Sequence, residues 1–209
     1  MVFSINVYSQ DSDLGNWLAY FGNKKINSKW NLHHEVQYRN YNVVGDLEQL
    51  LLRAGIGYSL TDNSNLLAGY GFIQSQNYLD NVDEKVNSSE HRIYQQFITL
   101  QSIDRIKVQH RYRFEQRWVD NDSFRLRFRY FLSLNIPINN ADIIDNTWYG
   151  SIYNEIFINN NENIFDRNRL YFGLGYKLNK LIKFEVGYMN QLFDVSSRDQ
   201  INLITFLNF

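Results

Sequence analysis

The chain of 209 residues contains no cysteine and only one proline, Pro137. The absence of cysteine excludes disulfides, cysteine-ligated zinc and thiol chemistry. The scarcity of proline favours long strands, because proline cannot donate a hydrogen bond within a sheet. No apolar run approaches the length of about 18 residues that a membrane-spanning helix needs. The net charge of −1 gives no overall attraction to nucleic acid or acidic lipid.

Aromatic residues are abundant, at 16% of the chain, as is typical of β-strands. We predict one β-domain over residues 11–209, which suits the length. Residues 1–10 are predicted to be the remnant of a secretory signal peptide, because an apolar start leads to the small-residue pattern Val7-Tyr8-Ser9. The alternative is a short disordered N-terminus.

A two-residue alternation of side-chain type is clearest between Arg105 and Asn135. Such a period predicts β-strands, because successive side chains point to opposite faces of a sheet. The polar break at Asp120 to Asp122 predicts a hairpin. The pattern recurs along the chain and gives about eleven candidate strands. Residues 90–101 form the one candidate whose faces the pattern does not assign.

Most candidate strands exceed ten residues, whereas strands of soluble proteins commonly have about five or six. Tilted strands of about nine to eleven residues or more are what a bilayer requires. We therefore predict an all-β fold, an antiparallel up-and-down transmembrane β-barrel of ten to twelve strands with alternating short and long connections. An even number is expected, either because one candidate lies outside the wall or because Pro137 to Asn146 hides another strand. The alternatives are a soluble β-sandwich and a lipocalin-like barrel.

In such a barrel, apolar rows face lipid and aromatic side chains form girdles at the interfaces. The predicted girdle residues are Trp17, Trp30, Tyr58, Trp118, Trp148 and Tyr176. The chain ends at Phe209, with apolar residues at every second position before it, which resembles the assembly signal of bacterial outer-membrane barrels. The expected partners are therefore outer-membrane lipid and, through the last strand, the barrel-assembly machinery. We expect a monomer in the bacterial outer membrane and no nucleic-acid partner.

A series of short motifs extends over nearly the whole chain. They are Gly15-Asn16-Trp17, Glu35-Val36-Gln37-Tyr38-Arg39, Gly69-Tyr70-Gly71, Glu90-His91-Arg92, Arg111 to Arg117, Arg125-Leu126-Arg127, Asn154-Glu155, Asp166 to Arg169 and Gly187-Tyr188. Their order and spacing resemble the DUF2490 family of uncharacterised Bacteroidota outer-membrane proteins. The resemblance implies an outer-membrane barrel and no particular activity.

If the apolar rows face lipid, the charged rows face the lumen. The predicted basic cluster is Arg39, Arg53, Arg111, Arg113, Arg117, Arg125, Arg127, Arg129, Arg169 and Lys183. The predicted acidic partners are Glu35, Glu115, Glu155 and Glu185. Arginine rows suit the binding or passage of small anionic solutes, because guanidinium forks match carboxylates and phosphates. The structural alternative, which we favour, is a plug of paired Arg and Glu side chains filling a narrow barrel.

A third class of function is a lipid-modifying enzyme, either a hydrolase or an acyltransferase. His33 and Glu35 share one face and could orient each other, but no serine is placed near them by spacing alone. His33 and His34 face opposite sides and cannot share a metal. We predict no catalytic residue, no metal and no cofactor. Three glycine pairs are predicted to face the lumen and make room for arginine and aromatic side chains: Gly55/Gly57, Gly69/Gly71 and Gly173/Gly175.

Overall fold

A computed structural model describes residues 14–79, 84–120, 123–160 and 163–209. It consists of strands joined by turns and loops. The strands are β1 (Gly15–Lys25), β2 (Trp30–Asn40), β3 (Leu47–Thr61), β4 (Ser64–Tyr78), β5 (Lys85–Ile103), β6 (Ile106–Val119), β7 (Ser123–Pro137), β8 (Thr147–Asn159), β9 (Phe165–Lys177), β10 (Ile182–Leu192) and β11 (Ser197–Asn208). Within these residues there is no helix long and apolar enough to cross a membrane. The predicted signal remnant at residues 1–10 lies outside the described residues.

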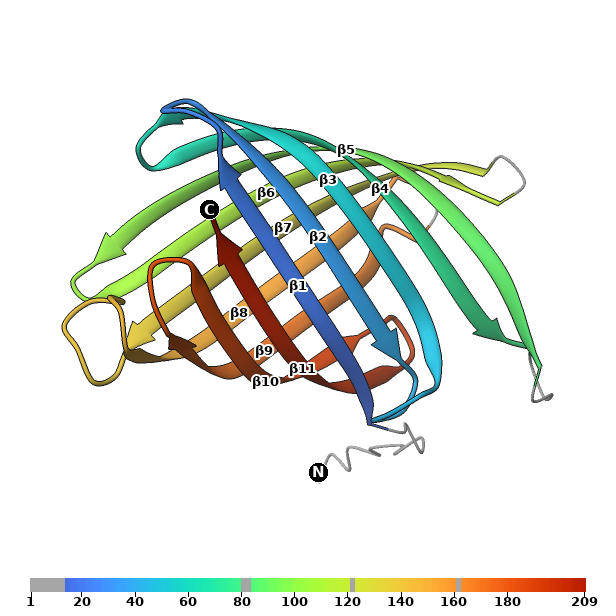
Figure 1. The fold of residues 1–209 in the computed structure, drawn as a ribbon. Coiled ribbons are helices and arrows are strands. Elements are labelled where there is room, and N and C mark those ends of the chain that lie inside the picture. Colours follow the sequence, from blue (N-terminus) through green and yellow to red (C-terminus); the bar gives the residue numbers. More distant parts are fainter. Residues whose placement is uncertain (1–13, 80–83, 121–122, 161–162) are drawn as a thin grey trace, which may run out of the picture.

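The eleven strands form one closed barrel in which each strand neighbours the next along the chain (Figure 1). All sequential neighbours pair antiparallel, as β1 with β2, whereas the closing pair of β1 and β11 is parallel. In that pair, Gly15 lies opposite Gln200 and Asn23 opposite Asn208. The predicted up-and-down barrel of ten to twelve strands is confirmed, with eleven strands, but the expectations of an even number and of antiparallel pairing throughout are wrong. Parallel closure removes the need for an even number, because the first and last strands run in the same direction.

The candidate strands read from the sequence are those of the barrel, and the loop 138–146 contains no strand. Two ends of the barrel can be distinguished. The "Phe209 end" carries the connections 26–29, 62–63, 104–105, 138–146 and 178–181; the "Gly15 end" carries the others and the start of β1. The predicted alternation of short and long connections is incomplete, because 138–146 lies at the same end as the two-residue turns.

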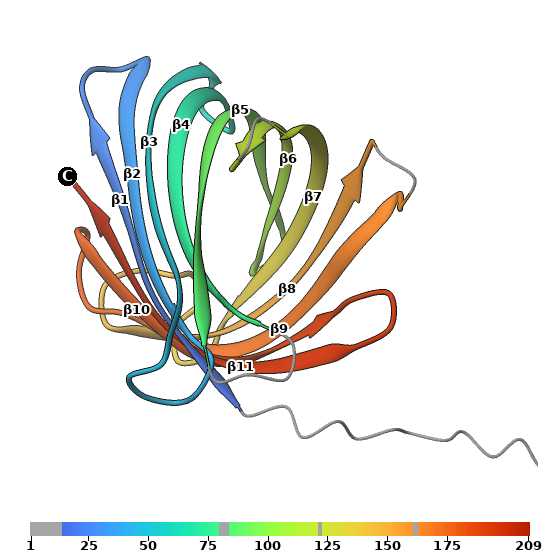
Figure 2. The ribbon, with the colours of Figure 1, turned by 90° about the vertical axis from the view of Figure 1, so that its right-hand side faces the viewer.

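Side chains alternate between the two faces of the wall, as predicted. Along β3, Leu52 and Ile56 are exposed on the outside, at 42% and 54%, while Leu51 and Arg53 are buried inside. Figure 2 shows the wall curving round from β1 through β5 and back to β11. The large exposed apolar side chains recur on strand after strand. The barrel is therefore turned inside out relative to a soluble protein, with charged residues in its interior and apolar residues on its surface.

Glycines in the wall give space to buried tyrosine rings. Gly69 of β4 lies opposite Tyr94 of β5, and Gly175 of β9 lies opposite Tyr149 of β8. A Cβ atom at either glycine would overlap the facing tyrosine ring. Both tyrosines are fully buried. The prediction that these glycines face the interior and make room for larger side chains is confirmed.

Candidate functional site

The barrel interior is crossed by ion pairs between strands, and Glu115 of β6 is one centre of them. Arg127 Nη2 donates to Glu115 Oε2 at 2.7 Å, and Arg129 Nη1 donates to Glu115 Oε1 at 2.7 Å. Arg113 lies farther away, with Nη1 at 3.7 Å from the carboxylate. Glu115 has no exposed surface. One buried carboxylate is thus shared among three guanidinium groups, a pattern that leaves a local excess of positive charge.

Glu155 of β8 is a second centre. It accepts hydrogen bonds from Arg111 Nη2 at 2.8 Å and from Arg129 Nη2 at 2.6 Å. Arg169 of β9 lies 3.6 Å away. Because Arg129 also binds Glu115, the two centres join into one network across β6, β7, β8 and β9. These residues were predicted from the sequence to line the interior, and the structure brings them together.

The sequence pattern did not assign the faces of residues 90–101. Two interior residues of β5, Glu90 and Arg92, were therefore absent from the predicted lumen residues. Glu90 accepts hydrogen bonds from both Arg92 and Arg117. A further missed acid, Asp166, accepts from Arg127 at 2.8 Å. Alternation could have found Glu90 and Arg92, because Tyr94 and Gln96 continue the same face. We call this network the "charged layer": Arg111, Arg113, Arg117, Arg127, Arg129, Arg169, Arg92, Glu90, Glu115, Glu155 and Asp166.

Trp17 lies inside the barrel, and its predicted place in the outer girdle is wrong. Its side chain is 6% exposed and lines the interior. The guanidinium carbon of Arg39 lies 3.7 Å from the ring centroid, and that of Arg169 lies 4.7 Å from it. The ring's electron-rich face attracts these cations, which explains why an aromatic residue sits among arginines.

The other predicted girdle residues face outward in pairs. Trp30 lies 4.9 Å from Tyr58 and Trp148 lies 4.7 Å from Tyr176, measured between ring centroids, and both pairs are near the Phe209 end. Trp118 lies near the Gly15 end, 5.3 Å from Phe124. Aromatic side chains therefore occupy the outer surface near both ends of the barrel.

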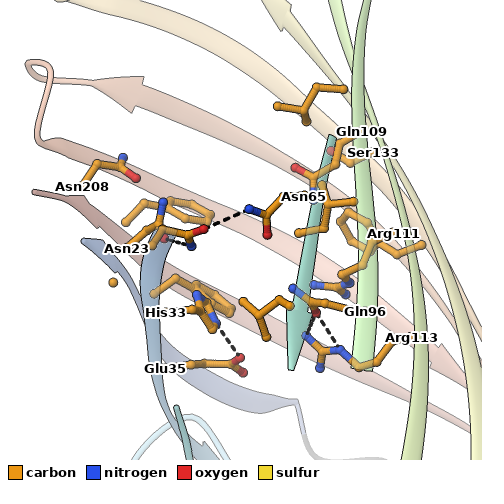
Figure 3. A pocket seen from close by; sticks show the side chains of 18 of the residues that line it. Asn23, His33, Glu35, Asn65, Gln96, Gln109, Arg111, Arg113, Ser133 and Asn208 are labelled. Atoms are coloured by element: carbon orange, nitrogen blue, oxygen red, sulfur yellow. Dashed lines mark hydrogen bonds and ion pairs between the residues drawn. The ribbon is translucent and has the colours of Figure 1, made fainter. Parts of the chain in front are cut away.

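A cavity of about 730 Å³ lies inside the barrel toward the Phe209 end. Its floor includes Arg53, Arg111, Arg113 and Glu35. Figure 3 shows that the arginines of β6 and the pair His33 and Glu35 of β2 enter it from different walls. Residues of the charged layer nearer the Gly15 end, including Glu90, do not line this cavity. Part of the charged layer thus lies at the floor of this cavity, and the rest of it lies nearer the Gly15 end.

Several arginine nitrogens at this floor have no hydrogen-bond acceptor among the residues that the structure describes. Arg113 spends two donors on the amide oxygen of Gln96, from Nε at 2.9 Å and Nη2 at 2.7 Å, and its Nη1 makes no hydrogen bond. Arg53 Nη1 donates to Glu35 at 2.6 Å, while its Nε is unpartnered. Arg111 Nε is unpartnered as well. Buried donors without acceptors are rare in folded proteins, and they mark positions where an anion would be stabilised.

The remaining predicted lumen residues are distributed along the interior. Lys183 and Glu185 of β10 line the cavity, and Tyr149 donates a hydrogen bond to Glu185 at 2.8 Å. Arg125 is exposed near the Gly15 end and takes no part in the charged layer. The missed residues Glu90, Asp166, Arg92 and Arg167 add equally to both signs, so the predicted excess of basic over acidic side chains is retained.

The histidines lie on both faces of the barrel wall. His33 Nε2 lies 3.6 Å from Glu35 Oε2 inside the barrel, as the shared face predicted. His110 contacts the Tyr130 hydroxyl at 2.8 Å on the outer face. Within residues 14–79, 84–120, 123–160 and 163–209, no serine or threonine hydroxyl hydrogen-bonds to a histidine. The described ranges also contain no cluster of three metal-ligating side chains.

The fold and interior define a closed β-barrel with an outward apolar surface and an arginine- and glutamate-rich lumen. The family model described as "Protein of unknown function (DUF2490)" matches residues 14–202, so the chain belongs to that family. An uncharacterised protein of Methylorubrum extorquens is 29% identical over 167 residues, which cover 75% of this chain and 69% of that protein. No solved structure matches the chain.

Proposed function

We propose that this protein is a bacterial outer-membrane β-barrel whose cavity binds small anionic solutes and whose charged layer prevents their free passage. The observation that carries the proposal is the gathering of Arg53, Arg111 and Arg113 at the cavity floor, where each keeps one buried guanidinium nitrogen without an acceptor among the described residues. In the low-dielectric interior of a barrel, such donors attract an anion more strongly than they would in water. A Bacteroidota origin remains a prediction.

The outward surface supports the membrane setting. Large apolar side chains such as Phe128 and Phe172 are half exposed and recur on all sides of the wall. A water-exposed apolar surface of this extent would cause aggregation, whereas a bilayer accommodates it. The closed sheet has no free edge, which suits lipid because every strand finds its hydrogen bonds within the wall. The outward apolar row of β11, ending at Phe209, is the proposed contact with the assembly machinery.

Fluorescence quenching by brominated lipid tests the membrane placement residue by residue. Four variants are needed, each retaining one of the tryptophans, with the other three replaced by phenylalanine. In vesicles containing brominated acyl chains, we expect Trp30, Trp118 and Trp148 to be quenched and Trp17 to remain bright. Equal quenching of all four, or of none, would contradict the proposed arrangement.

The variant that retains only Trp17 also reports on anion binding, because this ring lines the cavity. Titration with citrate should change its emission and give a saturable curve. Arg113→Gln should weaken binding by about tenfold or more, as expected for loss of a charge-assisted hydrogen bond. Arg125→Gln removes an exposed arginine at the other end and should leave binding unchanged. No saturable change in the parent protein would refute the binding proposal.

Planar-bilayer recording tests the closed state. The parent barrel should show no steady conductance across applied voltages, because the charged layer crosses the lumen. The double variant Arg127→Ser and Arg129→Ser removes two arginines from that layer and should either conduct or unfold at a lower temperature. A steady, anion-selective current through the parent protein would instead identify an open channel.

A further inference from the structure

The cavity wall carries more than positive charge, and its chemistry changes from the mouth to the floor. Near the mouth, side-chain amides are contributed by separate strands, among them Asn23, Asn65, Gln109 and Asn208. Figure 3 shows Asn23, Gln109 and Asn208 nearer the mouth than Glu35 and Arg113. Side-chain amides both donate and accept hydrogen bonds. The part of the cavity near its mouth therefore suits neutral polar groups of a ligand better than an ion.

Aromatic rings line the cavity between the amides and the arginines. Phe21 of β1 stacks on Phe206 of β11, with ring centroids 5.4 Å apart and planes inclined by 18°. Phe131 of β7 and Tyr153 of β8 form a second pair, 5.0 Å apart. All four residues line the cavity. Aromatic rings provide apolar surfaces with a negative face, against which the C–H groups of a sugar ring pack favourably.

Among the described residues, some buried polar atoms of side chains that line this space also lack hydrogen-bond partners. Asn202 is 2% exposed, and its Oδ1 accepts no hydrogen bond. Asn135 Oδ1 is unpartnered too, and so is the indole N–H of Trp17. Asn202, Asn135 and Trp17 all line the cavity. Leaving such buried groups unsatisfied costs free energy, which a ligand with several hydroxyl groups would recover.

We propose that the cavity recognises an acidic saccharide, a sugar that carries a carboxylate, with its acid at Arg111 and Arg113 and its ring between the aromatic residues and the amides. This inference rests on the proposed anion binding and assigns its ligand class. Arginine donors alone would suit any small anion. A volume of about 730 Å³ holds far more than one inorganic ion, and the faces of aromatic rings, which carry partial negative charge, do not attract sulfate.

The test compares three probes on the protein that retains only Trp17: glucuronic acid, glucose and sulfate. Glucuronic acid should bind at least about tenfold more tightly than either of the others. Phe206→Ala should weaken glucuronic acid binding several-fold and leave sulfate binding unchanged. Arg113→Gln should weaken the binding of both glucuronic acid and sulfate. Arg125→Gln, at the exposed Gly15 end, is the matched control and should change neither.

The outcomes separate the two proposals. Equal affinity for sulfate and glucuronic acid, together with no effect of Phe206→Ala, would overturn the saccharide inference and leave anion binding intact. Equal affinity for glucose and glucuronic acid would overturn the role assigned to the arginines. If neither citrate nor any of the three probes binds, both proposals are overturned. Thermal unfolding of each variant, followed by circular dichroism, shows whether a lost affinity reflects a lost fold; if Phe206→Ala unfolds, Phe206→Leu takes its place.

Discussion

The guanidinium group of Arg39 lies over the indole ring of Trp17, with 3.7 Å between the guanidinium carbon and the ring centroid. Its hydrogen bonds go to the amide oxygens of Gln37 and Gln49, at 2.6 Å and 2.8 Å. In the described part of the chain, no carboxylate forms an ion pair with Arg39. An aromatic face and two amides therefore take the place of a carboxylate, and the interior keeps its basic excess without an exposed charge.

Trp17→Leu should lower the free energy of unfolding by about 2 kcal/mol, because both the cation–π contacts and the fit of a buried ring are lost. Urea unfolding in detergent micelles, followed by circular dichroism, measures the change. Trp148→Leu is the matched control, because Trp148 faces outward at 46% exposure and, within the described residues, no cation lies over its ring. Equal losses in the two variants would show that Trp17 has no special role inside the barrel.

Glu115→Gln should destabilise the barrel strongly, by about 3–5 kcal/mol, because it leaves buried guanidinium groups without their shared counter-charge. Arg127 and Arg129 both bind this carboxylate at 2.7 Å. The unfolding midpoint in urea provides the measurement. Asp142→Asn breaks the exposed pair between Asp142 and Lys107 and should have a much smaller effect, since solvent screens surface ion pairs. If the two substitutions cost the same, the charged layer does not stabilise the fold as proposed.

Two glycines offer a direct test of ring packing within the wall. Gly175→Ala should lower the free energy of unfolding by about 1–3 kcal/mol, because the added methyl overlaps the fully buried ring of Tyr149. Gly150→Ala adds the same methyl where no heavy atom lies within 4 Å, and should be neutral or slightly stabilising. The comparison uses thermal unfolding of the two variants under the same conditions. A neutral Gly175→Ala would mean that Tyr149 can move aside.

Local alternation predicted most of the wall, because a period of two assigns each side chain to a face once a strand is recognised. The alternation did not assign faces to residues 90–101, because polar side chains lie on both sides of this strand: His91 and Gln95 face outward, and Glu90 and Arg92 are buried. It also misplaced Trp17, since aromatic residues occur both inside this barrel and at its outer rims. The sequence pattern did give eleven candidate strands, but the parallel pairing of β1 and β11 leaves no local trace in either strand, and so the expectation of an even number could not be corrected from the sequence.

Only the partners that face each other across a hairpin within the charged layer can be predicted from the sequence. Arg127 binds Glu115, its neighbour across the β6–β7 hairpin, and a hairpin predicts that pairing. Arg129, one pair further along, reaches Glu155 on β8 as well. Which arginine nitrogens stay unpartnered depends on these distances between strands. The candidate site is therefore a property of the closed barrel and not of any one motif.

Arg198 links the last strand to the loop 41–46 at the Gly15 end. Its Nη2 donates to the backbone oxygens of Asn40 and Tyr41, at 3.3 Å and 3.2 Å, and Nη1 lies 2.8 Å from Glu48. Arg198→Ala should raise amide hydrogen exchange in residues 41–46 by about tenfold, since the loop loses this anchor. Arg125→Ala, at the same end of the barrel but with no contact to this loop among the described residues, should not. Unchanged exchange in Arg198→Ala would show that the loop is held by other interactions, such as the Tyr41 N–H to Asp46 oxygen bond of 2.8 Å.

The loop 138–146 at the Phe209 end contains Asp142, whose carboxyl titration can be followed by NMR. The pKa of Asp142 is lowered, first by the hydrogen bond from Lys107 and then by the backbone N–H of Ile143. Because the folded pKa lies below the unfolded one, the stabilisation is present above the unfolded pKa and is lost as the pH falls through the folded value. In Lys107→Gln, the NMR titration midpoint of the Asp142 carboxyl should rise toward the ordinary value of about 3.9. It should not reach that value, because the Ile143 N–H still donates at 2.6 Å. Identical midpoints in the parent protein and in Lys107→Gln would show that Lys107 does not bind this carboxylate in solution.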